Sequence, residues 1–258
     1  MVKPRTRKEL RLMRESGRIT ALVLKKVLEN VKVGISSLDL NQISEEEIKK
    51  LGGESSFKTV PGYLFTTCIT VNEQVVHGIP TERKIEEGDV VSVDLGAVYK
   101  GWHTDASWTV LVRGQGVEGR VQQEKEKFIK IGEEALREGI DQATEGNRVG
   151  DISFAIQKKV EEAGYSIVRS LVGHGIGLKL HEDPQVPGCG KKNTGLILQS
   201  GMTLAIEVIY AQGSADVILE SDGWTISTAD GSLSALFEMT VAIGKLKAEI
   251  LTALRYIP

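Results

Sequence analysis

Apolar residues at helical spacing predict two helices at the start of the chain. Thr6–Glu9 has the form of a capping box, apolar positions follow it at roughly helical intervals, and Gly34 ends the segment. Ser37 can act as the N-cap of a second helix, which the glycine pair Gly52–Gly53 ends. The chain is therefore expected to begin with two consecutive helices.

The same order of elements is expected a second time along the chain. Short apolar, β-branched runs predict strands over about 57–112, two more helices are expected near 120–138 and 150–163, and strand-like runs resume from about 166 to 243. Strands grouped in this way favour an α+β fold with antiparallel sheet. No strong residue-level repeat accompanies the order, so only the elements suggest duplication.

The repeated order predicts one domain over 1–258, built from two pseudo-symmetric halves at about 1–115 and 116–250. We expect the antiparallel strands inside and the helices outside. Polar groups buried in each half would then face a shared centre.

Four carboxylates interrupt the apolar, strand-like runs. They are Asp94, Asp105, Glu207 and Glu238, and no arginine or lysine occurs within their runs. A buried carboxylate without a partner is strongly unfavourable, so each must be neutralised, paired or bound to a metal. A single such residue is usually a paired core residue, but four in one chain weaken that interpretation. Two divalent cations would balance the four negative charges.

The first two carboxylates flank a turn near Tyr99–Gly101, which predicts an antiparallel hairpin. Side chains alternate between the faces of a strand, so a regular register that pairs even with odd positions puts Asp94 and Asp105 on one face. A β-bulge would break this parity. The opposite face would carry Val91, Val93, Leu95, Trp102 and Trp108.

Composition narrows the classes of function. The chain has 258 residues, of which 41% are hydrophobic and 26% charged, and its net charge of −3 gives no electrostatic case for nucleic acid or a membrane surface. No signal-peptide pattern and no apolar run of about 18 residues appears, so secretion and membrane spanning are not expected. Two cysteines do not make a disulfide framework and favour a reducing, cytoplasmic compartment. The basic residues near the N-terminus are interleaved with Glu9 and Glu15, which predicts a solvated helix face, with a nascent-chain or RNA contact as the minority alternative.

Four histidines are available as further ligands or donors: His77, His103, His174 and His181. Glycines flank His174 in Gly173–Gly177, which lacks the Lys-Ser/Thr of a phosphate loop. A lone histidine is more often a satisfied polar residue than a ligand, and a strained turn would also account for the glycines. One imidazole with four carboxylates is nevertheless an oxygen-rich set that suits Mn(II), Fe(II) or Co(II) better than a structural zinc.

These residues predict metal-assisted hydrolysis. Two metals that share carboxylates would hold a water deprotonated near neutral pH, as a nucleophile for an amide or ester carbonyl. The remaining histidines could donate hydrogen bonds to the substrate or to the developing oxyanion. No serine or cysteine has the setting of a covalent nucleophile, since Cys68 lies in an apolar run and Cys189 in a Pro/Gly loop.

Several motifs follow one another along nearly the whole chain. They are Thr70–Pro80, the Asp94/Asp105 hairpin, Gly173–Pro187, Gly201–Glu207, Asp222–Thr225, Ser232–Ala235 and Glu249–Thr252. In these motifs the chain resembles the methionine aminopeptidases, specifically the short type I form of bacteria. The resemblance implies the pita-bread (creatinase/aminopeptidase) fold, a single catalytic domain and two divalent metal ions. It also implies removal of the initiator methionine from nascent chains when the second residue is small.

The resemblance also assigns roles to individual residues. Asp105 and Glu238 match bridging carboxylates, and Glu207 matches the proposed general base. His77 and His181 match two histidines that contact substrate near the scissile amide. The implied metal ligands are Asp94, Asp105, His174, Glu207 and Glu238.

A second implied set forms the pocket for the methionine side chain. By the resemblance, Tyr63, Cys68 and Trp224 match parts of it, and a sulfur atom and aromatic rims suit a thioether. Ordinary core packing is the alternative, and for Cys68 the two interpretations are about even. His103 lies two residues before Asp105 on the same predicted face and is expected behind the metal ligands at most.

Three positions depart from the family pattern. The family usually has proline where Val208 stands and histidine where Met239 stands, and an aromatic residue usually precedes His181, where this chain has Leu180. Strand alternation points Val208 and Met239 away from the metals. Leu180 puts a flexible aliphatic side chain in the pocket where the family has a rigid aromatic ring, so we expect weaker discrimination between methionine and leucine.

Other functions stay open on the sequence. An Xaa-Pro peptidase of the same fold is one alternative, although such enzymes typically carry an additional N-terminal domain, which we do not expect here. A broader-specificity aminopeptidase is another, and a non-catalytic homologue that binds ribosomes or other proteins is a third. The favoured expectation is a cytoplasmic monomer that acts on N-terminal Met peptides and nascent chains, with the ribosome as a further candidate partner and no membrane contact.

Overall fold

A computed structural model describes residues 3–114 and 119–253. Its helices lie where the hydrophobic pattern predicts them: α1 Arg7–Leu28, α2 Ser37–Lys50, α3 Arg120–Asp141 and α4 Val149–Glu162. The expected boundary between the halves, near 115/116, lies outside the described residues. A short 3-10 turn, η1 Phe57–Thr59, occupies the beginning of the region predicted as strands.

The N-termini of the first two helices are closed by capping boxes. The side-chain oxygen of Thr6 accepts a hydrogen bond from the backbone of Glu9, as predicted for α1. In α2 the N-cap is Ser36, whose side chain accepts from the Asp39 backbone, so the prediction of Ser37 as N-cap was wrong. Two adjacent serines both suit an N-cap, and only the position of the reciprocal Asp39 decides between them.

The strands of the described residues form one large and one small antiparallel sheet. The large sheet has ten strands, with the order β1-β4-β5-β12-β9-β7-β8 and three more strands, β2, β6 and β13, on its flanks; the small one has the order β10-β11-β3. The pairing of β5 with β12 joins the two predicted halves in one sheet. The strands are β1 Glu54–Ser55, β2 Thr67–Val71, β3 Gln74–Val76, β4 Val90–Tyr99, β5 Trp102–Leu111, β6 Ser166–Ile167, β7 Val172–Gly175, β8 Glu182–Pro187, β9 Thr203–Ala211, β10 Val217–Leu219, β11 Ile226–Thr228, β12 Ser234–Ala242 and β13 Glu249–Ile250.

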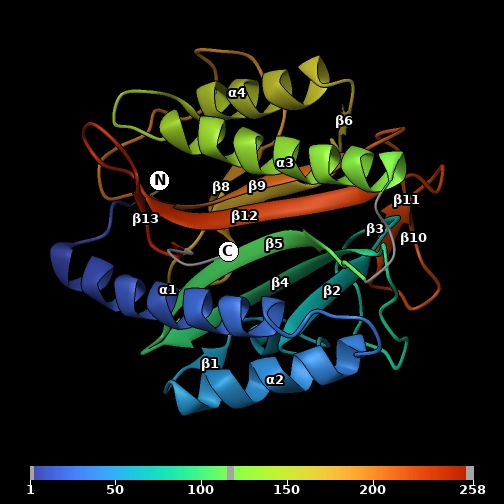
Figure 1. Cartoon of the computed structure of the whole chain (residues 1–258). Coiled ribbons are helices and arrows are strands. Elements are labelled where there is room, and N and C mark those ends of the chain that lie inside the picture. Colours follow the sequence, from blue (N-terminus) through green and yellow to red (C-terminus); the bar gives the residue numbers. More distant parts are fainter. Residues whose placement is uncertain (1–2, 115–118, 254–258) are drawn as a thin grey trace.

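Each pair of helices covers the outer side of its own half of the sheet. Figure 1 shows α3 and α4 above β9 and β12, and α1 and α2 below β4 and β5. Val208 and Met239 belong to the core under α3 and α4, whereas Val93 and Leu95 belong to the core under α1 and α2. Burial of these apolar faces fixes the orientation of the strands, because every second side chain must point the other way. Those alternate side chains face the space between the two halves.

None of the helices in the described part of the chain has the combination of length and apolar character that a membrane crossing requires.

Candidate active site and metal centre

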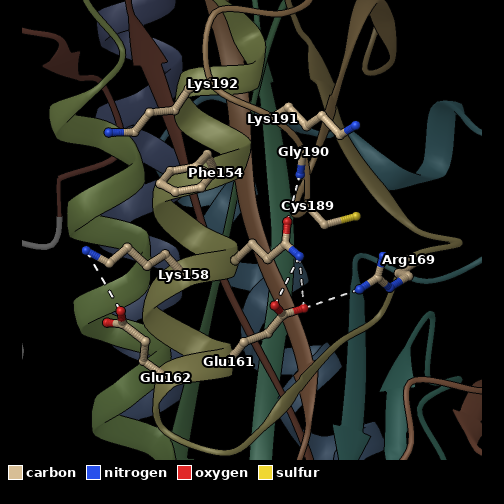
Figure 2. A pocket seen from close by; sticks show the side chains of 10 residues that line it. Phe154, Lys158, Glu161, Glu162, Arg169, Cys189, Gly190, Lys191 and Lys192 are labelled. Carbon is tan, nitrogen blue, oxygen red and sulfur yellow. Dashed lines mark hydrogen bonds and ion pairs between the residues drawn. The ribbon is translucent and has the colours of Figure 1, made fainter.

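A surface groove lies beside α4, away from the four carboxylates. It has a volume of about 730 Å³, and its acidic side chains are paired: Glu161 with Arg169 at 3.2 Å and Glu162 with Lys158 at 3.8 Å. Figure 2 shows these pairs on the outer side of α4. We call it the α4 groove, and it is lined by Phe154, Gln157, Lys158, Glu161, Glu162, Arg169, Cys189, Gly190, Lys191 and Lys192.

A second cavity, of about 150 Å³, contains every residue to which the sequence assigns a site role. We call it the cleft, and it is smaller than the α4 groove but lies where strands of both halves meet. Its lining consists of Phe57, Val60, Tyr63, Cys68, Val76, His77, Asp94, Asp105, His174, Leu180, His181, Glu207, Trp224, Leu236 and Glu238. Phe57, Val60, Val76 and Leu236 were not singled out from the sequence; Leu236 lies two residues before Glu238 on the same strand, a spacing that could have identified it.

The strand register brings the carboxylates together. In the β4–β5 hairpin Asp94 lies opposite Ser107 and Gly96 lies opposite Asp105, so even positions pair with odd ones and both aspartates share a face. The parity prediction is confirmed. Glu207 and Glu238 lie directly opposite each other across β9 and β12. The two pairs therefore come from adjacent parts of one sheet.

Two glycines allow this hairpin to form. Lys100 and Gly101 connect its strands with φ angles of 49° and 80°, the positive values that a two-residue type I′ turn requires. Gly96 lies across from Asp105, and a Cβ at Gly96 would lie 2.6 Å from the Thr104 carbonyl oxygen and 2.8 Å from the Ser56 Cβ. A larger residue at Gly96 would therefore push the strand away from Ser56 and shift Asp105.

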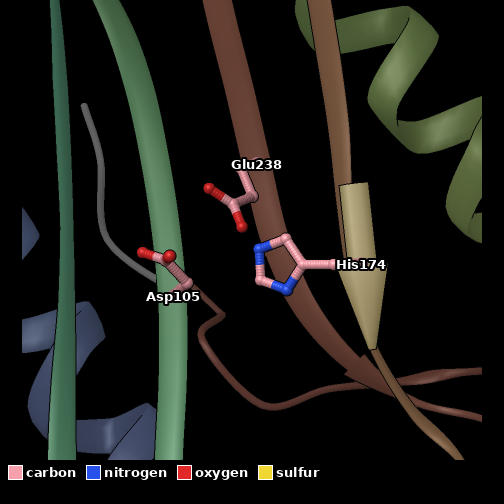
Figure 3. A group of neighbouring side chains, drawn as sticks. All are labelled: Asp105, His174 and Glu238. Atoms are coloured by element: carbon pink, nitrogen blue, oxygen red, sulfur yellow. The ribbon is translucent and has the colours of Figure 1, made fainter. Parts of the chain in front are cut away.

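Three side chains of the cleft form a compact group of ligand atoms. Asp105, His174 and Glu238 each offer one atom, and these atoms lie within 4.8 Å of one another. Figure 3 shows the three side chains converging from β5, β7 and β12. All three are less than 9% exposed. Glu207 joins the group, since its Oε1 lies 3.6 Å from the Nε2 of His174.

Basic side chains of the described residues do not balance the charge of the four carboxylates. Among the described residues no lysine or arginine forms an ion pair with any of them, and Asp94 Oδ1 and Glu238 Oε1 are buried without a hydrogen-bond partner. Burial raises the pKa of Asp105 to about 7. Burial, and then the neighbouring carboxylates, hold the pKa values of Asp94, Glu207 and Glu238 well above their usual range. These groups are therefore poised to exchange protons for a cation.

His174 is held as a neutral ligand. One ring nitrogen, Nδ1, lies 2.9 Å from the Gly175 carbonyl oxygen and donates a hydrogen bond to it. The other nitrogen, Nε2, therefore carries a free lone pair, and it faces Glu207. Burial, reinforced by His181, lowers the pKa of His174 to about 4. A neutral imidazole whose second nitrogen is bonded to a backbone carbonyl is the usual form of a metal-bound histidine.

Asp105 is also held in place by its surroundings. Its backbone N–H donates to the Thr240 hydroxyl at 2.9 Å, that hydroxyl donates to the Asp105 carbonyl at 2.8 Å, and the Ala106 N–H donates to Oδ1 at 3.0 Å. The orphaned oxygens and the carboxylate–imidazole donor set fit divalent metal ions. Thr240 lies on β12, so these bonds also hold β5 and β12, and with them Asp105 and Glu238, in register.

Two histidines lie at the mouth of the cleft. His77 and His181 are exposed in part, and the ring of His181 packs edge-on against that of His174, with centroids 4.5 Å apart. The protein packed around both rings lowers the pKa of each, and His181 contributes further to the lowering at His77. Both rings are therefore neutral near pH 7, and each retains one N–H donor.

The other end of the cleft is apolar and aromatic. The ring of Tyr63 meets that of Trp224 edge-on at 5.1 Å, and its hydroxyl donates to the Thr67 carbonyl while accepting from the Cys68 thiol at 3.1 Å. Leu180 is buried in the same cluster. This end presents a thiol, two aromatic rings and a branched aliphatic side chain within reach of the carboxylates.

His103 and the departures on β9 and β12 lie outside the cleft. His103 Nδ1 lies 2.5 Å from the Ser56 hydroxyl, and the residue is buried. Val208 and Met239 pack in the core under α3 and α4, as strand alternation predicts. Neither substitution places a side chain in the cleft.

Known proteins resemble this chain in sequence and in structure. The profile of metallopeptidase family M24 matches residues 11–245. Methionine aminopeptidase 1 of Bacillus subtilis is 43% identical over 98% of this chain and 99% of its own length, and the methionine aminopeptidase of Clostridium perfringens is 45% identical over 96% and 97%.

The crystal structure of methionine aminopeptidase from Thermotoga maritima superposes with a TM-score of 0.93 at 40% identity, covering 98% of this chain and 99% of that one. A prolidase from Pyrococcus furiosus, 22% identical, shares the fold with a TM-score of 0.77. These similarities confirm the predicted pita-bread fold. The chain belongs to metallopeptidase family M24 and, within it, to the methionine aminopeptidases.

Proposed function

We propose that this protein removes the initiator methionine from N-terminal Met peptides and nascent chains whose second residue is small. The observation that carries the proposal is the buried carboxylate–histidine cluster at the junction of the two halves, next to an aromatic, thiol-bearing pocket. We further propose that the two halves act as a single catalytic domain, which works as a monomer in the cytoplasm. The ribosome is a further candidate partner.

The ligands of two divalent metal ions would be Asp94, Asp105, His174, Glu207 and Glu238. When bound, the ions would supply Lewis acidity and lower the pKa of water to near neutrality. Mn(II), Fe(II) and Co(II) all suit this set of oxygens and one imidazole.

The protein residues would move the protons and orient the peptide. Glu207 has a raised pKa, so it can take a proton from water and give it to the departing amine near neutral pH. His77 and His181 each have a neutral ring with one N–H, which can donate to the peptide carbonyl and to its developing negative charge. Neutral rings also avoid repulsion from the free amino group of the substrate.

The aromatic end of the cleft would hold the methionine side chain. Tyr63 and Trp224 would contact the thioether, and Cys68 would line the wall beside it. Leu180 belongs to the same cluster, which favours a pocket that also admits leucine or norleucine with reduced preference. A broader-specificity aminopeptidase is therefore the second candidate function.

A metal titration tests the proposal. Protein treated with chelator and verified as metal-free should not cleave a Met-Ala-Ser peptide, and added Mn(II), Co(II) or Fe(II) should restore release of methionine, detected by mass spectrometry. Full activity without metal, or preferred cleavage before proline, would refute it.

A further inference from the structure

The segment that carries Leu180 and His181 into the cleft is joined to the neighbouring strands by backbone pairing near its two ends. We call it the His181 loop; it runs from Ile176 to Glu182, between β7 and the start of β8. Its main-chain bonds to the rest of the molecule include Ile176 N–H to the Thr203 carbonyl at 3.2 Å and His103 N–H to the Gly177 carbonyl at 2.7 Å. Both lie at the start of the loop, and at its end Glu182 pairs with Gly175 of β7, so His181 lies between the two points of support. The position of His181 must therefore depend on side-chain contacts as well.

Arg5, from the segment before α1, provides such contacts. Its guanidinium forms an ion pair with the Glu182 carboxylate and donates to the Ile176 carbonyl at 3.3 Å and to the Thr203 hydroxyl at 3.2 Å. The same hydroxyl donates to the Ile176 carbonyl at 2.5 Å. One cation thus contacts both ends of the His181 loop and the adjoining strand β9.

Glu182 connects these contacts to the middle of the loop. While Oε2 pairs with Arg5, Oε1 accepts a hydrogen bond from the Lys179 backbone N–H at 3.0 Å. The carboxylate therefore fixes the turn that immediately precedes Leu180 and His181. Removing the cation would leave a partly buried carboxylate with only the backbone bond to orient it.

Arg5 has further contacts that hold its side chain and its backbone in place. It lies 5.4 Å from the centroid of the Trp102 ring, and the Arg5 backbone N–H donates to the Gly201 carbonyl at 2.8 Å. A Cβ at Gly177 would lie 2.3 Å from Nη2 of Arg5, so a glycine is needed there to admit the side chain. The Arg5 side chain is only 13% exposed, which makes this pair less screened by solvent than a surface pair.

We propose that Arg5 is a positioning residue for catalysis: through Glu182 and Ile176 it holds the His181 loop so that His181 faces the scissile amide. The proposal rests on the function proposed above for His181. Arg5 itself touches neither the cleft nor the ligand cluster.

The matched control is Arg14, which also lies near the N-terminus and also pairs with a distant glutamate. It bonds Glu249 at 2.6 and 2.8 Å, but this pair is about half exposed and does not touch the His181 loop. Arg14→Ala should leave kcat and KM unchanged. Any effect of losing an arginine near α1 as such would appear in this variant too.

Arg5→Ala should lower kcat on Met-Ala-Ser about tenfold without lowering metal affinity, because a shift of about 1 Å in a catalytic donor costs up to 10²-fold. Arg5→Lys keeps the charge but loses the guanidinium fork, so its kcat should lie between those of Arg5→Ala and the parent.

Glu182→Gln should also lower kcat, and it replaces Arg5→Ala if that variant does not fold. In a His181→Ala background, Arg5→Ala should cause no further loss, since it acts through the missing ring. Additive losses, or an Arg5→Ala kcat equal to the parent's, would overturn the proposal.

Hydrogen exchange gives a readout that does not depend on activity. Peptides covering residues 176–182 should exchange faster in Arg5→Ala than in the parent, and at the parent's rate in Arg14→Ala. Unchanged exchange in Arg5→Ala would refute the positioning role even if the parent were fully active. If instead the parent showed no aminopeptidase activity while exchange in Arg5→Ala changed as expected, the proposed function would fail, but the role of Arg5 in holding the His181 loop would be supported.

Discussion

The cleft and the α4 groove both hold acidic side chains and a cysteine, but the acidic side chains differ in exposure and in pairing. In the α4 groove Glu161 and Glu162 are exposed and paired with Arg169 and Lys158. In the cleft four carboxylates lie together, Asp105 and Glu238 buried and Asp94 and Glu207 largely so, and two of their oxygens have no hydrogen-bond partner. Exposed pairs such as those of the groove are each worth only about 0–1 kcal/mol, so the surface carries them at little cost.

A carboxylate that is withdrawn from water without a partner is far more costly, and a fold that gathers four carboxylates in one cleft gains from a bound cation. Between these two cavities, volume alone does not identify the candidate active site. The α4 groove is the larger of the two, at about 730 Å³ against about 150 Å³. Electrostatic cost, rather than size, distinguishes the candidate active site.

Removing one carboxylate from each region should produce the largest contrast. Glu238→Gln should reduce metal-dependent cleavage of Met-Ala-Ser by more than about a hundredfold, because loss of even an outer partner of a ligand costs 10–100-fold. The same change should raise the melting temperature of the metal-free protein by relieving repulsion with Asp94, Asp105 and Glu207. Glu161→Gln in the α4 groove should change neither quantity. Equal effects of the two substitutions on turnover would remove the distinction between the regions.

The histidines of the cleft should divide into two classes. His77→Ala and His181→Ala should keep their metal content and lose about 10²–10³ in kcat, the usual cost of one donor to a developing oxyanion. His174→Ala should instead lower metal affinity. Metal analysis beside steady-state kinetics checks this division, which would be wrong if all three variants lost metal alike.

The pH dependence of metal binding should sharpen the comparison further. The pKa of Asp105 is raised from 3.8 to about 7, so metal-free Asp105 holds a proton at pH 5 that a cation must displace. Its raised pKa stabilises the metal-free fold below about pH 4, and that contribution is lost as pH rises through about 7. Metal affinity should therefore increase, and the melting temperature of the metal-free protein should fall, between pH 5 and 8. Calorimetric titration with metal and thermal melts at several pH values measure both, and an affinity that does not change with pH would contradict the cluster's electrostatics.

The smallest expected effect concerns the wall of the pocket. With Leu180 the ratio of kcat/KM for Met-Ala-Ser over Leu-Ala-Ser should be modest, because a methylene-scale difference is worth only about 1–3 kcal/mol. Leu180→Phe should raise the ratio by restoring a rigid aromatic wall. The same ratio in both proteins would show that Leu180 does not shape specificity.

Much of the site could be predicted from the sequence because its strands are regular. The β4–β5 register contains no bulge between Asp94 and Asp105, so parity alone puts both on one face. The same alternation placed Val208 and Met239 in the core. The local sequence pattern of Thr6 followed three residues later by Glu9 likewise predicted the capping box of α1.

Contacts between distant segments could not be predicted in this way. The pairing of Arg5 with Glu182 joins residues 177 positions apart, and no periodicity or spacing links them. Phe57 enters the cleft through a 3-10 turn rather than a strand, so alternation did not apply to it. Such contacts depend on how the two halves of the sheet come together.

Anomalous diffraction tests the central claim, that the buried carboxylates form a metal centre, most directly. Crystals grown with Mn(II) and measured at the manganese absorption edge should show two strong peaks in the cleft, bounded by Asp94, Asp105, His174, Glu207 and Glu238. No comparable peak should appear in the α4 groove. Absence of peaks in the cleft from protein that cleaves Met-Ala-Ser, or peaks confined to the α4 groove, would contradict the account.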